Sequence, residues 1–541
     1  MPSTKEIQEK AERIQFIDFH PYAASKLGQE PWIIVWQHNE ADGRGNETYY
    51  SALLPKGYKQ RALSDYSWDL SLGSGMPWSY RNKETGDVSY FRFSDNDGIE
   101  PLVFSRNFNG AATPFHEICE DFRHYFNLFE KPTKRGTFIY VDDSGDEEEV
   151  VRQSSSKIEI KLGLMKRYLT ARDMFLALYF EHNRFELLTL DELGIKAESR
   201  DYKSDNIFYH ASVVSFDLGL GDEKTLGRVM GKKIISGLDT DDLTEWEGEP
   251  KQYEEFIIKV DTNGKPVLFT CNESDLLDMA QESDGTRPYF LTPIFFSQDV
   301  LSDYYSNPDK YEVQDGYVSC YGLWGLRMDN NHDEHVIAYL GDLGHLPYKE
   351  QQRWKRFNIV PDGGISVVEW RRGFMAEFAD PERVDLKFKH VFRNVCRNWQ
   401  KNRGWNLFLP LAKADSHHLI SLHIPNTDNQ AEFDQQILSL CKVVIESINI
   451  AELRKQFTPS KVDLPPIGLL EEYLANIGFS ETGKFISILR RLQAVRSAGT
   501  AHRKGDNYDK AMISLGLDET GLRLLFTRVL SELIEHFEIL Q

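Results

Sequence analysis

Cysteine is scarce in this chain of 541 residues, and long hydrophobic runs are absent. The cysteines occur singly and form no Cys-x-x-Cys pair, which excludes a zinc ribbon and a redox pair and argues against a disulfide framework. No apolar run approaches the roughly 18 residues of a membrane span. The first six residues, Met-Pro-Ser-Thr-Lys-Glu, lack the apolar core of a signal peptide. We therefore expect a cytoplasmic protein that does not enter a membrane. The five cysteines are Cys119, Cys271, Cys320, Cys396 and Cys441.

Basic residues are also in deficit, since 63 Lys and Arg stand against 84 Asp and Glu, for a net charge of −21. Such an acidic chain is a poor candidate for a general nucleic-acid coat or a binder of anionic membranes, although a local basic patch remains able to bind RNA. The hydrophobic fraction of 41%, with 12% aromatic residues, is enough to build buried cores. The length predicts several domains.

The first 430 residues or so alternate strand-like and helix-like segments, which predicts an α+β fold for the N-terminal portion. Residues 32–36 (Trp-Ile-Ile-Val-Trp) form a short apolar run typical of a buried strand. Residues 157–181 predict a strand, a helix and a second strand. Thr113-Pro114 predicts the start of a helix, because Phe115, Ile118, Phe122, Phe126 and Phe129 follow it at helical spacing.

Two hairpins are expected further along. Asn263-Gly264 stands between two β-rich runs and is a strong two-residue turn signal. A second hairpin joins residues 318–326 to residues 336–340. The N-terminal region is also rich in aromatic residues, which we expect to be core, with a recognition surface as the alternative. They are Trp32, Trp36, Tyr49, Tyr50, Trp68, Trp78 and Tyr80.

Strand signals stop after residue 425, and an all-α bundle is predicted from residue 431 onward. Its four expected helices span residues 431–457, 469–477, 480–495 and 522–540. This divides the chain into an N-terminal α+β region (1–150), a second α+β region that is a candidate sensor (151–430) and the helical bundle (431–541). The bundle carries a net charge of −2, so nearly all of the acidic excess lies before it.

One basic stretch interrupts the bundle. Residues 484–510 contain seven basic and two acidic residues, and within them Arg496 and His502 are separated by five residues. This motif, in a C-terminal helical bundle, resembles the HEPN superfamily, whose ribonuclease members carry Arg, four to six residues, and then His. The resemblance covers about the last fifth of the chain. The family's usual Asn after Arg is replaced by Ser497 here.

The resemblance implies that Arg496 and His502 are catalytic, without a metal or another cofactor. Histidine titrates near neutral pH and can move the protons of the 2′-hydroxyl and the leaving 5′-oxygen. Arginine can hold the phosphate oxygens. Six positions on one helix turn through about 240°, so a bend at Gly499-Thr500 is expected to let the two side chains converge. The residues expected to bind RNA are Ser497, Arg490, Arg491, Arg503 and Lys504.

In this family two copies pair so that both motifs line one cleft, which implies a homodimer or a higher oligomer. Leu524 and Ile534 extend the apolar face of the last helix beyond one narrow stripe, which gives the dimer some support. The alternative to a dimer contact is that the N-terminal portion of the same chain covers these two residues.

Two groups of residues have the chemistry of metal ligands. His332, Asp333, Glu334 and His335 are expected in a hairpin tip, where neighbouring side chains point to opposite faces, and a polar turn is the favoured interpretation. Asp415, His417, His418 and His423 form the second group. No metal site is predicted at either.

The leading functional hypothesis is a metal-independent endoribonuclease that resembles bacterial antiphage or abortive-infection effectors. Its RNA would be cut at the bundle, and residues 1–430 would sense an unknown trigger, either a phage protein or a nucleic acid. One alternative makes the N-terminal portion a separate, metal-dependent enzyme and leaves the bundle only to dimerise. Another makes the protein a non-catalytic scaffold that binds RNA or nucleotides.

Overall fold

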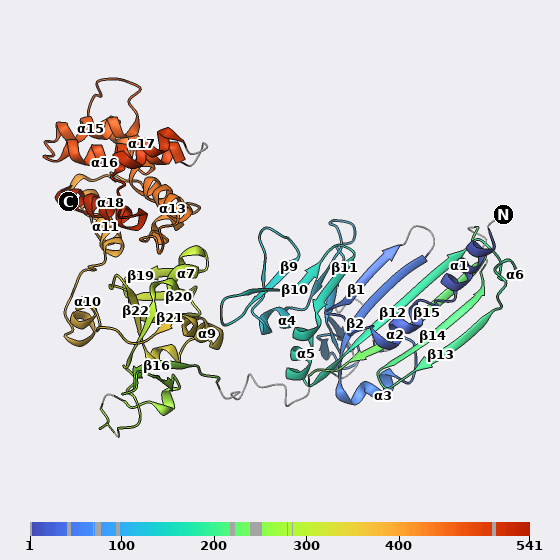
Figure 1. Ribbon diagram of the computed structural model, residues 1–541. Helices are drawn as coiled ribbons and strands as arrows, with labels where there is room; N and C mark the ends of the chain where they lie inside the picture. The colour runs from blue at the N-terminus through green and yellow to red at the C-terminus, as the bar shows by residue number, and fades with distance from the viewer. Residues whose placement is uncertain are drawn as a thin grey trace. The chain divides into compact units, whose positions relative to one another are not determined.

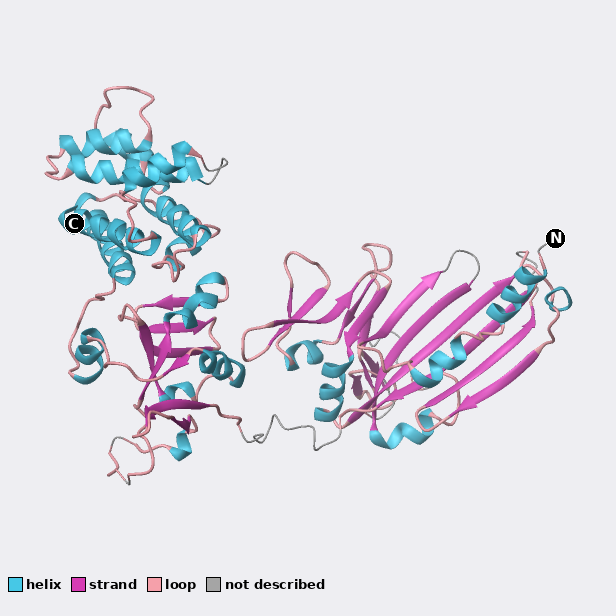
Figure 2. Ribbon diagram, viewed as in Figure 1, coloured by secondary structure: helices cyan, strands magenta, loops and turns pink. Residues whose placement is uncertain are grey.

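A computed structural model describes residues 3–40, 45–68, 70, 77–93, 98–216, 222–238, 251–278, 280–283, 285–499 and 505–540. The chain forms two compact units, residues 1–142 with 146–250 and residues 143–145 with 251–541 (Figure 1). Figure 2 shows that strands dominate the first unit and that helices form the C-terminal part of the second. The prediction of an α+β chain with a helical C-terminal region is therefore confirmed.

An eleven-stranded antiparallel sheet forms the first unit. Its strands run in the order β13-β14-β15-β12-β2-β1-β11-β10-β9-β8, and β5 adds to β2. The bounds are β1 (Trp32–Glu40), β2 (Gly45–Pro55), β5 (Glu100–Pro101), β8 (Phe129–Glu130), β9 (Thr137–Val141), β10 (Glu147–Gln153), β11 (Lys157–Lys161), β12 (Met174–Glu186), β13 (Glu198–Lys203), β14 (Ile207–Ser215) and β15 (Thr225–Ile235).

Shorter elements accompany this sheet. Two further hairpins pair β3 (Trp78–Arg81) with β4 (Val88–Phe91) and β6 (Val103–Arg106) with β7 (Phe115–Ile118). The helices are α1 (Thr4–Ile14), α2 (Phe19–Ser25), α3 (Lys59–Ala62), α4 (Glu120–Tyr125), α5 (Leu162–Ala171) and α6 (Leu190–Leu193).

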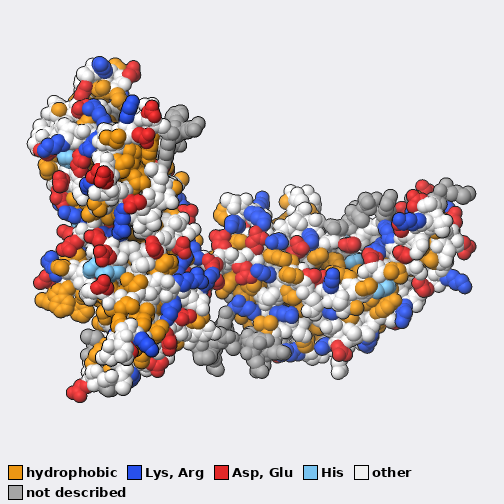
Figure 3. Space-filling view, viewed as in Figure 1, with side chains coloured by type: hydrophobic (Ala, Val, Ile, Leu, Met, Phe, Trp, Pro, Cys, Tyr) orange, Lys and Arg blue, Asp and Glu red, His pale blue; other side chains and the backbone are white. Residues whose placement is uncertain are grey.

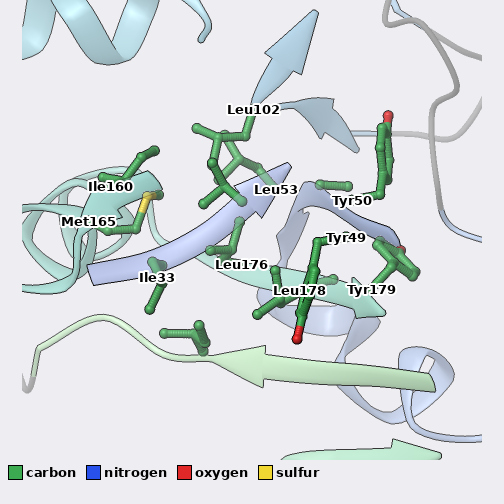
Figure 4. Packing of buried hydrophobic residues seen from close by; sticks show 14 of the residues in the cluster. Ile33, Tyr49, Tyr50, Leu53, Leu102, Ile160, Met165, Leu176, Leu178 and Tyr179 are labelled. Carbon is green, nitrogen blue, oxygen red and sulfur yellow. The ribbon is translucent and has the colours of Figure 1, made fainter. Parts of the chain in front are cut away.

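The central strand β12 is covered on both faces. Successive side chains of a strand point to opposite faces, so Phe180 meets Phe19 of α2 at 5.6 Å between ring centroids, whereas Tyr179 meets Trp68 at 5.8 Å on the other face. This explains why its apolar residues form a nearly continuous run instead of alternating. Figure 4 shows Leu176 and Leu178 of β12 packed with residues of β1 and β2.

Several local predictions in the first unit are confirmed. The run at residues 32–36 opens β1, and residues 157–181 form β11, α5 and most of β12. The helix predicted from Thr113 is wrong, because Phe115–Ile118 is β7, which pairs with Val103–Arg106. Cys119 then has an extended conformation, and α4 begins only at Glu120. Pairing with a neighbouring strand decides the structure of a segment whose apolar spacing alone fits a helix.

The aromatic residues divide into two groups. Trp36, Tyr49 and Tyr50 are buried, as expected for core residues. Trp78 and Tyr80 lie on β3 and are 44% and 54% exposed. The expectation of a core position is therefore wrong for these two, because the β3–β4 hairpin packs only lightly on the rest of its unit.

The second unit begins with a β subdomain, defined as residues 251–383. Its sheet has the order β19-β20-β21-β22-β18-β23 beside the hairpin β16–β17. The bounds are β16 (Glu255–Val260), β17 (Pro266–Thr270), β18 (Pro293–Ser297), η4 (Gln298–Leu301), α7 (Ser302–Ser306), β19 (Tyr311–Gln314), β20 (Tyr317–Cys320), β21 (Trp324–Asp329), β22 (His335–Tyr339), α8 (Leu340–Leu343), α9 (Tyr348–Arg356), β23 (Asn358–Ile359) and α10 (Val367–Glu369).

Both predicted hairpins form. Gly264 turns between β16 and β17 with a φ of 78°, which suits glycine. β21 pairs with β22 through Met328 and Ala338. The run at residues 318–326 is divided between β20 and β21 by a turn in which Tyr321 has a φ of 47°.

The helical subdomain, defined as residues 384–540, completes the second unit. Its elements are α11 (Val384–Arg403), α12 (His417–Ile420), α13 (Gln430–Cys441), the π-helical turn η6 (Lys442–Glu446), α14 (Ile450–Gln456), α15 (Pro466–Asn476), α16 (Thr482–Gly499), α17 (Asp506–Leu515) and α18 (Leu522–Leu540). In the described part of the chain, no helix has both the length and the apolarity needed to cross a bilayer.

This subdomain begins earlier than the expected onset at residue 431. α11 packs against α18, with Phe392 and Phe537 at 5.6 Å between ring centroids, so both helices belong to one core. The expected helix over 431–457 is interrupted after η6, where Asn449 accepts a hydrogen bond from the N–H of Glu452 and caps α14. α17 has no counterpart among the expected helices.

Glu432 in the first turn of α13 fixes the loop before that helix. It accepts hydrogen bonds from the N–H of Asn426 (2.7 Å) and from the N–H and hydroxyl of Thr427 (3.3 and 2.9 Å). The His423 Nε2 lies 3.7 Å from Glu432 Oε1. Burial opposes ionisation, but these partners outweigh it and lower the pKa of Glu432 to about 2.

A pH-dependent loss of stability is expected from this carboxylate. Its pKa is lower in the folded chain than in the unfolded chain, so its contribution is present above about pH 4.5 and is lost as the pH falls toward 2. Glu432→Gln should cost about 3 kcal/mol near pH 6 and almost nothing near pH 2. Urea unfolding of both proteins across this range measures the difference. A difference that does not change with pH would contradict this prediction.

Candidate functional site

Arg496 lies in the last turn of α16. The helix buries Phe485, Ile488, Leu489, Leu492 and Val495 at helical spacing, which fixes its orientation in the core. Arg496 follows Val495 at the edge of this buried face, and its side chain is 29% exposed. Its guanidinium forms an ion pair with the carboxylate of Glu446, which ends η6.

The other described arginines of the basic stretch point to different helices. Arg490 pairs with Glu471 of α15 and Arg491 pairs with Glu532 of α18, both at 2.5 Å. Arg490, Arg491 and Arg496, the described arginines predicted for RNA contact or catalysis, therefore each already have a carboxylate partner. Figure 3 shows acidic and basic side chains interspersed over the helical subdomain. The local excess of positive charge in the sequence does not become a continuous basic surface among these three residues.

The end of α16 is held against the start of α17. A Cβ on Gly499 would lie 2.7 Å from the ring of Tyr508, so the absence of a side chain at Gly499 permits this contact. The Tyr508 hydroxyl donates to Asp434 of α13 (2.8 Å) and accepts a hydrogen bond from Gln430 (2.7 Å). The two described ends of the segment 500–504 are thereby brought together.

Of the remaining predicted site residues, Ser497 is described by the structure and the others are not. Ser497 is exposed on α16, next to Arg496. α16 continues as a helix to Gly499, so the predicted bend does not occur before that residue, and Thr500 lies outside the described residues. His502, Arg503 and Lys504 also lie outside the described residues.

The ion pair of Arg496 belongs to a longer series of charged side chains. Glu446 lies 3.9 Å from Lys442, and Lys442 donates to Asp415 at 2.8 Å. Lys442 lowers the pKa of Asp415 through this hydrogen bond. His418 Nε2 lies 3.7 Å from Asp415. Charges on α12, η6 and α16 are thus in contact from one helix to the next.

Glu446 is the residue of this site that sequence reasoning misses. It lies fifty positions before Arg496, and the motif gives no information about it. The only local signal is a carboxylate directly after the apolar residues Val443, Val444 and Ile445. An acidic residue at the edge of a buried helix face is a candidate partner for a basic residue on the helix packed against it.

The first candidate metal group does not form a metal site within the described residues. The rings of His332 and His335 stack at 4.0 Å between centroids, and Gln298 donates to both of their carbonyl oxygens. Among all the residues that the structure describes, no three Cys, His, Asp or Glu side chains lie close enough together to bind one metal ion.

Three members of the second candidate group, Asp415, His418 and His423, have other partners. Asp415 pairs with Lys442, His418 Nδ1 lies 2.9 Å from the Ser439 hydroxyl, and the His423 ring stacks on Tyr305 at 4.0 Å. These contacts are typical of structural polar residues.

Comparison with known proteins gives no relative for this chain. No family model, no curated protein and no solved structure matches it.

Proposed function

We propose that this protein is a metal-independent endoribonuclease of the HEPN type, with its active site at the end of α16. The observation that carries the proposal is the position of Arg496 in the last turn of α16, three residues before the helix ends at Gly499, which packs on Tyr508. His502 is three residues beyond Gly499 in the sequence. The proposal requires this short connection to bring the acid–base group His502 to the phosphate clamp Arg496.

The proposed reaction is transesterification of RNA. His502 would remove the proton of a 2′-hydroxyl, which then attacks the adjacent phosphorus, and a protonated histidine would protonate the departing 5′-oxygen. Arg496 would stabilise the extra negative charge on the phosphate oxygens. In the structure Glu446 occupies the Arg496 guanidinium, so the phosphate must share or displace this carboxylate.

A homodimer or higher oligomer suits this chemistry, because a second copy supplies the second histidine. Leu524 is 49% exposed and is available for such a contact. Ile534 is only 4% exposed within a single chain, so the expectation that it extends a dimer surface is wrong. The proposal places the protein in the cytoplasm as a bacterial antiphage or abortive-infection effector. Residues 1–430 would respond to a phage protein or nucleic acid and raise the activity of the nuclease above its basal level.

One alternative has a specific observation in its favour. Arg490, Arg491 and Arg496 are all paired with carboxylates, which suits a scaffold whose helices are held together by these ion pairs and which does not cut RNA. Such a protein would still bind RNA or nucleotides elsewhere.

RNA integrity in cells and in vitro tests the proposal. Expression of the wild-type chain is expected to stop growth and fragment RNA, whereas His502→Ala expressed at the same level does neither. The purified wild-type protein should cut RNA in the presence of EDTA and leave 2′,3′-cyclic phosphate and 5′-hydroxyl ends. Cleavage that depends on a divalent metal, or toxicity retained by His502→Ala, would refute the proposal.

A further inference from the structure

The hairpin formed by β3 and β4 exposes aromatic side chains on both of its faces. Trp78 and Tyr80 lie on one face, because side chains alternate along a strand. Tyr90 pairs with Ser79 and therefore lies on the other face, where it is 68% exposed. Apolar and aromatic side chains that gather on a surface, outside the core, indicate a recognition site. The hairpin thus suits the recognition surface that the sequence leaves open for the aromatic residues of this region.

Hydrogen bonds and one ring contact give the exposed hairpin a defined shape. In the turn, the Asn82 side-chain oxygen accepts a hydrogen bond from the N–H of Glu84 at 2.9 Å, and the Asn82 N–H donates to the carbonyl of Asp87 at 2.8 Å. At the other end, the Phe93 ring lies 6.1 Å from the ring of Phe104 on β6, which ties the hairpin to its neighbour. A surface that is already ordered loses less conformational freedom when it binds a partner.

The Tyr90 ring is open to a flat ligand. Its neighbour across the strands on the same face is Ser79, which is too small to cover it. Within the part of the chain that the structure describes, the Tyr90 side chain has no ring contact and no hydrogen bond. The Trp78 ring, in contrast, already stacks on Phe91 at 4.4 Å between centroids. An exposed ring without an aromatic neighbour can stack on the planar ring of a ligand.

The charges beside this ring select the sign of the ligand. Arg81 lies on the same face as Tyr90, and Arg92 directly follows β4. Both arginines are exposed, and neither guanidinium has a carboxylate partner among the described residues. The acidic residues Glu84 and Asp87 lie in the turn and not on the strands. The described arginines of α16, in contrast, are all paired with carboxylates. Two unpaired cations beside an open ring attract a polyanion, although the chain as a whole is acidic.

We propose that the β3–β4 hairpin binds single-stranded nucleic acid, with a base stacked on Tyr90 and phosphates held by Arg81 and Arg92. A single strand suits this surface because its bases are accessible, whereas the bases of a duplex are already stacked on one another. Arg81 stands opposite Val88, four positions before Arg92, so the two cations are about 13 Å apart along the strands. A bound strand can therefore contact both cations while one of its bases lies on the ring between them. The inference concerns binding alone and does not depend on the nuclease proposal.

Fluorescence anisotropy of the full chain with a labelled 2′-O-methyl RNA of about 12 nucleotides tests this site. The probe lacks the free 2′-hydroxyl that the proposed transesterification needs, so its binding is measured whether or not the protein cuts RNA. Tyr90→Ala should weaken binding about 5-fold or more, which corresponds to the loss of one stacked base. Tyr90→Phe, which keeps the ring, should bind as the wild type does.

The salt dependence of binding tests the two arginines. The double variant Arg81→Gln with Arg92→Gln should reduce the slope of log affinity against log salt concentration by about 1.4, because each phosphate contact on a single strand contributes about 0.7. A DNA strand of the same sequence should bind through the same contacts. Tighter binding of one of the two strands identifies the natural ligand as RNA or as DNA.

Tyr317→Ala is the matched control, because Tyr317 is also an exposed tyrosine on a strand, 43% exposed on β20 in the other unit. It should bind the probe as the wild type does. The proposal is overturned if the wild-type chain does not bind the single strand, which would leave the aromatic surface to a protein partner. It is also overturned if a duplex of the same length binds as tightly, or if Tyr90→Ala loses no more affinity than Tyr317→Ala.

Discussion

Replacing Arg496 with alanine is expected to lower the rate of RNA cleavage by about 100- to 1000-fold, the range seen when a single donor to a charged transition state is removed. Arg496 is the described basic side chain nearest to the point where the chain leaves α16, and Glu446 fixes its guanidinium there. In the proposed reaction, its loss would leave the phosphate without the guanidinium's positive charge when the negative charge on its oxygens is greatest. Initial rates on a defined RNA, measured in EDTA, give the effect.

Arg490→Ala is the matched control for this variant. Arg490 lies on the same helix and also pairs with a carboxylate, Glu471, but it is six positions earlier and on another side of α16. Its replacement should change the rate by less than about 10-fold, the effect of one contact that only attracts the RNA. Equal losses in both variants would mean that the arginines serve only the packing of the subdomain.

The second large effect is expected from Asp385→Ala, which should lower the free energy of unfolding by about 3–5 kcal/mol. Asp385 is buried between Arg383, whose Nε lies 3.2 Å away, and Lys389. Burial alone would raise the pKa of Asp385, but these two cations and the N–H of Ile424 outweigh it and lower the pKa. Burial lowers the pKa of Lys389 to about 8. Without Asp385, two buried cations lose their shared counter-charge.

Urea unfolding followed by far-ultraviolet circular dichroism measures this loss, because the helical subdomain supplies much of the signal. Asp380→Ala is the control. Asp380 also pairs with a basic side chain, His390 at 3.3 Å, but its own side chain is 82% exposed. Its replacement should cost less than about 0.5 kcal/mol. A loss below about 1 kcal/mol for Asp385→Ala would show that the three charges are solvated in the native state.

The fold could be predicted where local signals agree. In residues 157–186, alternation in β11, helical spacing in α5 and a buried apolar run in β12 point to the same structure. From Phe115 onward the spacing fits a helix, but the partner strand at Val103–Arg106 decides otherwise. No local pattern contains that pairing.

The N-terminal boundary of the helical subdomain could not be predicted from local signals. In α11, Phe388, Val391, Phe392 and Val395 recur at helical spacing, so the helix itself is present in the sequence. The stretch that follows, residues 406–411, resembles a strand and separates α11 from the later helices. Only the packing of α11 on α18 shows that both belong to one core.

The candidate site could be predicted in part. The motif identifies Arg496 and its position near the end of a helix, because both depend on residues close in sequence. The carboxylate partners could not be predicted, because Glu446, Glu471 and Glu532 come from three other elements that the fold brings to α16. A count of charges along the chain therefore overstates the positive charge of this region.

The place of β2 in the large sheet also determines how the protein can be made. β2 ends at Pro55 and pairs with β1 on one side, but β12, its partner on the other side, begins only at Met174. At a synthesis rate of about 5–20 residues per second, the ribosome needs roughly 6–24 s to supply that partner. During this interval the apolar residues Tyr50, Ala52, Leu53 and Leu54 lie on an open strand edge, the kind of surface that pairs with other chains. We therefore expect that protection of the nascent chain by a chaperone over this interval raises the yield of folded protein.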